Sequence, residues 1–72
     1  MGVNLSDCQV EKPTFILSIL AEDSERGRLA SLGVYPGAEI KVIAKNASGL
    51  LVALGQGRLT LALAAAELIQ VA

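Results

Sequence analysis

The sequence contains no histidine, no tryptophan and a single cysteine, Cys8. Without histidine, the Ser-His-Asp and Cys-His arrangements of hydrolases cannot form, and the commonest transition-metal ligand is missing. One cysteine excludes an intrachain disulfide, and Cys8 has no basic neighbour that would lower its pKa. These absences leave no group of residues for covalent or acid–base catalysis. We therefore expect neither an enzyme nor a bound cofactor.

Aromatic side chains are also scarce, since Phe15 and Tyr35 are the only two in 72 residues. Two rings are too few for a base-stacking platform or for an aromatic groove that binds proline-rich peptides. The six basic and seven acidic side chains are interspersed and sum to a net charge of −1. Proteins that bind phosphate backbones usually have a basic patch, which is missing from this pattern. We therefore expect no nucleic acid partner.

No apolar run approaches the roughly 20 residues that a transmembrane helix needs. The longest run, residues 59–72, is interrupted by Thr60, Glu67 and Gln70. The start of the chain, MGVNLSDCQVE, is polar and acidic, unlike a secretory signal. We therefore predict a cytoplasmic protein in a reducing compartment, without direct membrane insertion.

The chain is rich in apolar side chains, which make up 53% of its residues. This length allows one domain with one core, spanning residues 1–72, and residues 1–12 are polar enough to be loosely ordered. A core of this size rarely supplies more than about 3–5 kcal/mol, so small domains often depend on partners. Part of the apolar surface could therefore bind a partner.

Alternating and β-branched residues predict five strands. They cover residues 14–20, 39–45, 50–55, 58–63 and 68–71, and tight turns at 46–49 and 55–57 and a helical turn at 64–67 join the later ones. In the first strand, Phe15, Leu17 and Ile19 share one face and Ile16, Ser18 and Leu20 the other. In the second, we expect Ile40, Val42 and Ala44 to face inward. Short strands with one helix after the first favour a small five-stranded antiparallel barrel, since closing the sheet removes exposed edges.

Residues 21–33 predict the short helix. Asp23 or Ser24 can cap its start by accepting backbone N–H bonds. Leu29 and Leu32 share a face, which either docks the helix on the barrel or contacts a partner. The helix therefore has two possible uses for its apolar side chains, and both remain open at this stage.

The residues after the helix favour two sharp changes of direction. Gly33 suits a left-handed position that ends the helix. Pro36 and Gly37 suit the two central positions of a type II turn, because proline fixes φ and glycine accepts a positive φ. Together they predict a helix, a tight turn and then a strand.

The stretch RLASLGVYPGAEIKV, residues 28–42, resembles the motif RLxxLGxxPGxx[IV]xV of the FeoA family. These are small cytosolic accessory proteins of bacterial ferrous iron uptake. The chain fills every motif position, with Arg28, Leu29, Leu32, Gly33, Pro36, Gly37, Ile40 and Val42. A second match to the family lies near the C-terminal end, with Ala62, Leu63, Ala66, Ile69, Gln70 and Val71. The chain departs from the family at Ala64, where members often have arginine, and in the NASG turn, where they often have proline.

The resemblance implies an SH3-like barrel, no enzymatic activity, and docking on FeoB, the membrane GTPase that transports ferrous iron. We expect the partner surface within residues 26–37. Its candidate side chains are Arg26, Arg28, Leu29, Leu32, Tyr35 and Pro36. Arg28 matches the motif and suits an acidic partner surface, and Tyr35 precedes the turn as an amphipathic side chain of a kind common in interfaces.

Two other functions stay open. Glu22, Asp23 and Glu25 are close enough in sequence to gather a divalent ion such as Fe²⁺, although the helix dipole also favours acidic residues at a helix start. Such a site would make the chain a metal-responsive interaction module. The surplus apolar surface could instead form a weak homodimer.

Overall fold

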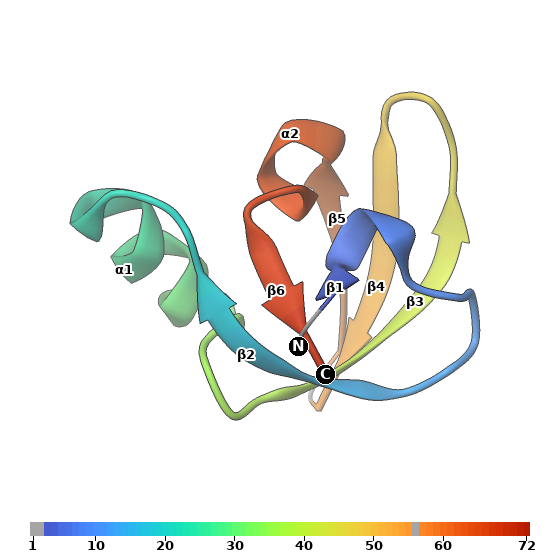
Figure 1. Cartoon of the computed structure of the whole chain (residues 1–72), viewed down its shortest axis with the longest axis horizontal. Helices are drawn as coiled ribbons and strands as arrows, with labels where there is room; N and C mark the ends of the chain where they lie inside the picture. The colour runs from blue at the N-terminus through green and yellow to red at the C-terminus, as the bar shows by residue number, and fades with distance from the viewer. Residues whose placement is uncertain (1–2, 56) are drawn as a thin grey trace.

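The computed structural model describes residues 3–55 and 57–72. Six strands form an antiparallel sheet in the order β1-β6-β2-β3-β4-β5 (Figure 1). Their bounds are β1 (Val3–Asn4), β2 (Thr14–Ile19), β3 (Glu39–Lys45), β4 (Gly49–Leu54), β5 (Gly57–Ala62) and β6 (Ile69–Val71). The mostly β antiparallel fold is confirmed. The strand number is corrected from five to six, and the sheet is not closed, because β1 and β5 are its two edges over the described ranges.

Three short helical segments accompany the sheet: η1 (Leu5–Asp7), α1 (Asp23–Ser31) and α2 (Leu63–Ala66). Helix α1 follows β2, so it comes after the second strand rather than the first. The predicted capping by Asp23 or Ser24 is wrong, because Glu22 occupies the N-cap position and makes no side-chain capping bond. No helix within residues 3–55 and 57–72 is long and apolar enough to span a membrane.

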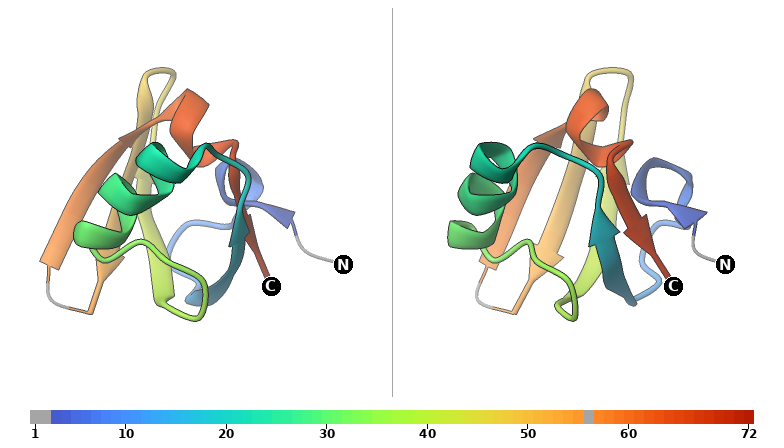
Figure 2. Two further views of the ribbon diagram at one scale, coloured as in Figure 1. Left: turned by 90° about the vertical axis from the view of Figure 1, so that its left-hand side faces the viewer. Right: turned by 60° about the vertical axis from the view of Figure 1, so that its left-hand side comes forward.

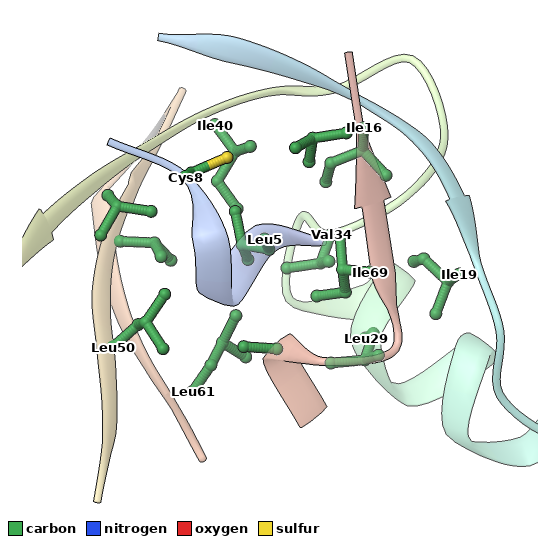
Figure 3. Packing of buried hydrophobic residues seen from close by; sticks show 14 residues of the cluster. Leu5, Cys8, Ile16, Ile19, Leu29, Val34, Ile40, Leu50, Leu61 and Ile69 are labelled. Atoms are coloured by element: carbon green, nitrogen blue, oxygen red, sulfur yellow. The ribbon is translucent and has the colours of Figure 1, made fainter. Parts of the chain in front are cut away.

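The core is entirely apolar. Its buried members come from η1 and its flank, α1, α2, the loop before β3 and every strand except β1 (Figure 3). They are Leu5, Cys8, Ile16, Ile19, Leu29, Val34, Ile40, Val42, Leu50, Val52, Leu61, Ala66, Ile69 and Val71. No polar or charged side chain of the described residues is buried. Burial of apolar area is therefore the main stabilising term of this small domain.

Residues 3–8 contribute to this core, although polar composition suggested loose order for residues 1–12, of which 1–2 lie outside the described residues. Strand β1 pairs with β6, and the next residue, Leu5, is fully buried. The Asn4 side chain caps η1 by accepting the Ser6 N–H at 3.0 Å and donates to the Glu67 carbonyl at 2.6 Å. The Asn4 side chain thus connects β1 to the C-cap of α2, next to the buried Leu5.

Two β-bulges change which side chains face inward. In β2, the register against β6 shifts between Ile16 and Ser18, so that Ile16 and Ile19 are both buried. The predicted shared face of Phe15, Leu17 and Ile19 is therefore wrong: the first two are 54% and 51% exposed. In β3, the register against β4 shifts between Val42 and Ala44, and Ala44 is exposed rather than inward. An extra residue in one strand reverses the alternation that follows it.

Helix α1 stands beside the part of the sheet that β4 and β5 form (Figure 2). Leu29 is the one buried residue of α1. The helix is therefore attached near its C-terminal end, and its remaining surface is available to solvent.

Candidate functional site

The C-terminal end of α1 has the hydrogen bonds of a Schellman motif. The Val34 N–H donates to the Leu29 carbonyl at 2.9 Å, and the Gly33 N–H donates to the Ala30 carbonyl at 3.0 Å. Gly33 has a φ of +97°, the left-handed conformation predicted for it. Leu29 and Val34, which the motif brings together, are both buried. This end of the helix is therefore fixed to the core.

The turn that follows is fixed in a second way. The Ala38 N–H donates to the Tyr35 carbonyl at 3.1 Å, and Gly37 has a φ of +94°, as a type II turn requires. The Gly37 N–H donates in addition to the Ile16 carbonyl of β2 at 2.8 Å. The turn is thus hydrogen-bonded to the sheet, and Tyr35 and Pro36 are exposed on it.

The structure divides the six predicted partner-binding residues into two groups. Leu29 is 1% exposed and faces the core, so its side chain is not offered to a partner. Leu32 and Tyr35 are 43% and 49% exposed. Arg26, Arg28 and Pro36 are also exposed. We call these last five residues the docking surface.

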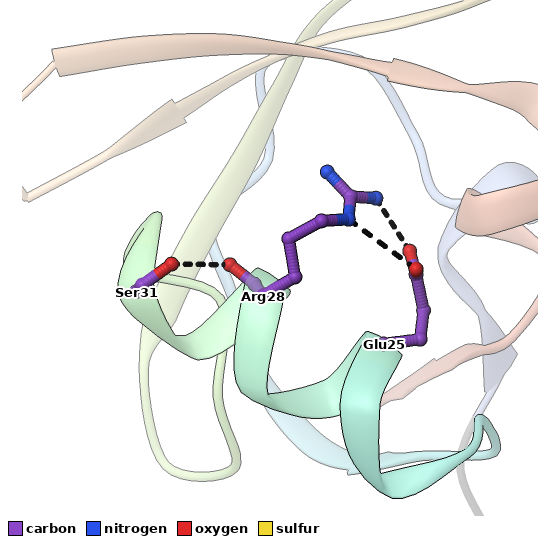
Figure 4. Close-up of polar contacts among 3 residues, drawn as sticks. All are labelled: Glu25, Arg28 and Ser31. Carbon is purple, nitrogen blue, oxygen red and sulfur yellow. Dashed lines mark hydrogen bonds and ion pairs between the residues drawn. The ribbon is translucent and has the colours of Figure 1, made fainter.

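Both arginines of the docking surface are paired within α1. Arg26 pairs with Asp23. Arg28 donates to Glu25 from Nη2 at 2.5 Å and from Nε at 3.3 Å, while Ser31 Oγ donates to the Arg28 carbonyl (Figure 4). The hydrogen bond from Arg28 lowers the pKa of Glu25, and the same bond raises the pKa of Arg28. Exposed pairs of this kind contribute little to stability, so a partner's carboxylate could replace Glu25 at small cost.

A groove of about 600 Å³ lies between the end of α1, the turn and the hairpin of β4 and β5. Leu32 and Tyr35 lie on one wall, and Arg58 and Leu59 of β5 lie on the other. We call this feature the groove; its full lining is Ala30, Ser31, Leu32, Gly33, Tyr35, Ala38, Glu39, Leu54, Gly55, Gly57, Arg58 and Leu59. It combines apolar side chains with one cation and one carboxylate, as protein interfaces often do.

The hairpin wall of the groove was not predicted from the sequence. Leu54, Arg58 and Leu59 are more than twenty residues from the helix in the chain, and only the fold brings them to it. The alternating pattern of β5 predicts a strand but does not indicate that the end of α1 lies next to it. Residue Gln56 of the predicted turn at 55–57 lies outside the described residues.

The acidic candidates for a metal site are not brought together. Within residues 3–55 and 57–72, no three Cys, Asp or Glu side chains form a group that could hold an ion. Asp23 and Glu25 instead accept bonds from Arg26 and Arg28. Cys8 lies at the edge of the core, and burial raises the pKa of its thiol. Its thiol therefore lacks the lowered pKa of a reactive cysteine.

Comparison with known proteins gives concordant matches. The FeoA domain family model matches residues 3–72. A crystal structure described as an iron uptake regulatory protein, FeoA, superposes with a TM-score of 0.89 at 28% identity, covering 99% of this chain and 96% of that one. FeoA from Chlorobium tepidum gives 0.86 at 30% identity, over 96% and 68% of the two chains.

A third similar structure is a zinc complex of FeoA from Stenotrophomonas maltophilia, described as a procaryotic SH3 domain protein. Its TM-score is 0.80 at 28% identity, over 100% of this chain and 89% of that one. The match to this structure gives the chain an SH3-like fold. No curated protein matches the chain.

Proposed function

The chain belongs to the FeoA family, which is associated with ferrous iron transport, and from this premise we propose that it is a cytoplasmic accessory protein that docks on a FeoB-type transporter. It binds the cytosolic part of that transporter through the docking surface and the groove. It contributes a binding surface and performs no reaction of its own. Docking would bias the transporter's conformation, its nucleotide cycle or its assembly.

The observation that carries this proposal is the exposure of Leu32 and Tyr35 beside the groove. Both side chains are large, and each is nearly half exposed, although the Gly33 and Val34 N–H groups between them are hydrogen-bonded to carbonyls of α1. Exposed aromatic and aliphatic side chains next to a hollow, with charged groups around them, are typical of the centre of a protein interface. Arg26 and Arg28 supply the charged rim.

The proposal is tested by an NMR titration of the labelled chain with the soluble cytosolic domain of a FeoB-type transporter from the same source. We expect chemical shift changes that cluster on residues 26–37 and on the hairpin wall of the groove. The absence of any change at high concentrations of the domain would contradict docking.

A double variant tests whether the docking surface makes the contact. Arg28→Glu with Tyr35→Ala reverses one charge and removes one ring, and we expect at least a tenfold loss of affinity, which corresponds to about 1.4 kcal/mol. The matched control is Lys12→Glu with Val10→Ala, which makes the same kinds of change at exposed positions elsewhere. Equal affinity of the double variant and the native chain would exclude this surface.

The metal-responsive alternative has one finding in its favour, which is that the Stenotrophomonas relative is complexed with zinc. It is tested by titrating the chain with Fe²⁺, Mn²⁺ and Zn²⁺. Our proposal expects no micromolar site at the start of α1. Micromolar binding that disappears when Glu22, Asp23 and Glu25 are changed to amides would favour the alternative instead.

A further inference from the structure

Strand β5 is an edge of the sheet that carries few of the usual protections against strand addition. It pairs with β4 over six consecutive residue pairs without a bulge, and over the described residues no strand pairs with its other side. Its sequence, GRLTLA, contains no proline and one charge, that of Arg58. Edge strands that avoid further pairing usually carry bulges, prolines or several charges.

The register shows which backbone groups β5 turns outward. The Leu63 N–H donates to the Ser48 carbonyl at 3.2 Å, which continues the β4–β5 ladder past its last strand pair. In an antiparallel ladder, alternate residues bond to the partner strand. Leu61, two residues before Leu63, therefore directs its N–H and C=O groups toward β4. The N–H and C=O groups of Arg58 and Thr60, at the alternate positions, point away from β4.

The groove reaches this outward edge at the start of β5. Three consecutive residues of β5, Gly57, Arg58 and Leu59, line it. The groove also touches Glu39 of β3 and Leu54 of β4, so it crosses this end of the sheet and reaches β5 beside Arg58. The other wall is formed by Leu32 and Tyr35 of the docking surface.

We propose that β5 accepts an extended segment of the transporter's cytosolic part as an added strand. This inference rests on the proposed docking function and specifies its geometry. Backbone bonds to Arg58 and Thr60 would hold the segment, and its side chains would enter the groove. The segment carries a carboxylate opposite Arg58 and an apolar side chain next to Leu59 and Leu32, because cross-strand neighbours pair by charge and by apolar contact.

The charges around the groove favour such a partner over a second copy of this chain. Strand β5 contains no acidic residue, so two copies paired through β5 would leave Arg58 without a carboxylate in every register. Glu39 also lines the groove and would repel a run of acidic residues. The chemistry therefore fits a segment with one carboxylate placed at Arg58.

Amide hydrogen exchange of the full labelled chain, with and without the transporter's cytosolic domain, tests this geometry. We expect the Arg58 and Thr60 amides to exchange at least tenfold more slowly in the complex. The Leu61 amide, which already bonds to β4, is the internal control and should change less. Binding with unchanged exchange at Arg58 and Thr60 would overturn the added strand and leave docking intact. No binding at all would overturn both.

Two variants give an independent readout. Thr60→Pro removes an outward N–H and keeps the bonds to β4, and proline is tolerated at such edge positions. Arg58→Glu reverses the charge that the carboxylate meets. We expect each to weaken binding of the domain at least tenfold, with Lys12→Glu as a control that does not. If Thr60→Pro perturbs the amide spectrum of the free chain, Arg58→Glu alone decides. Native affinity in Arg58→Glu would overturn the proposed carboxylate contact.

Discussion

The sheet and helix α1 are held in place in different ways. Each of β2, β3, β4 and β6 places two side chains in the core, and β5 places one. Helix α1, nine residues long, places only Leu29 there. Its other side-chain contacts include two ion pairs between residues three apart on its own surface. The comparison shows that the sheet is held by burial along its length, whereas the helix is held at one end and leaves most of its surface exposed.

The largest expected difference in stability between the sheet and helix α1 comes from removing Leu29, the side chain that holds the helix on the core. Leu29→Ala removes a side chain that is 1% exposed, and we expect it to lower the free energy of unfolding by roughly 2–5 kcal/mol, as for other buried leucines. Leu32→Ala, which removes an exposed side chain at the C-cap of the same helix, should cost less than about 1 kcal/mol. Chemical denaturation measures both. Equal losses would show that the helix is not held mainly by Leu29.

The next effect lies in the sheet, at Gly49. A Cβ atom there would come within 2.2 Å of the Leu61 carbonyl oxygen, which belongs to the neighbouring strand and cannot move alone. We expect Gly49→Ala to lower the free energy of unfolding by roughly 1–3 kcal/mol, because overpacking forces the backbones apart. Thermal denaturation monitored by circular dichroism measures the change. Native stability would mean that β4 and β5 separate at this point more easily than their pairing suggests.

A glycine in the helix should give the opposite sign. Gly27 is exposed inside α1, and a Cβ there meets nothing within 4 Å. We expect Gly27→Ala to raise the free energy of unfolding by roughly 0.5–1 kcal/mol, because alanine loses less backbone freedom in a helix. Ala30→Gly at another exposed position of α1 is the matched control and should lower it by a similar amount. A lower free energy of unfolding in Gly27→Ala would contradict this expectation, because it would mean that the added methyl group clashes although nothing lies within 4 Å of it here.

The smallest effect concerns the Glu25–Arg28 pair. The pKa of Glu25 lies below its usual value of 4.5 because Arg28 donates to it. The pair's stabilisation is therefore complete above that usual value and is lost as the pH falls through the lowered pKa. Arg28→Gln should return the pKa of Glu25 toward its usual value, and Arg26→Gln should leave it unchanged. A pH titration of the side-chain carboxyl carbon by NMR measures it. An unchanged pKa in Arg28→Gln would mean that the pair does not persist in solution.

The local features of the fold could be predicted from the sequence. Gly33 and the turn at Pro36 and Gly37 depend on backbone preferences of single residues, and both adopt the predicted conformations. Strands β3, β4 and β5 follow from their alternating or β-branched and apolar residues. The bulges at Ile16–Ser18 and Val42–Ala44 could not be predicted, because an inserted residue shows only against the partner strand.

Features that depend on distant parts of the chain were also missed. Strand β1 has two residues, and its pairing with β6 joins opposite ends of the sequence. Likewise, the candidate site was predicted only on the side of the helix and the turn, within residues 26–37. The wall with Arg58 and Leu59 belongs to a different hairpin, and only the folded chain brings it beside the helix.

The hydrogen bond from Gly37 to the Ile16 carbonyl has a consequence for the thermodynamics of binding. Together with the buried Leu29 side chain, it fastens both ends of the segment that carries Leu32, Tyr35 and Pro36. Ordering a free loop on association costs conformational entropy, and a segment already held in its binding conformation avoids most of that cost. The segment with these three side chains is thus preorganised, so under the proposed docking the affinity for a partner can come from a few side chains.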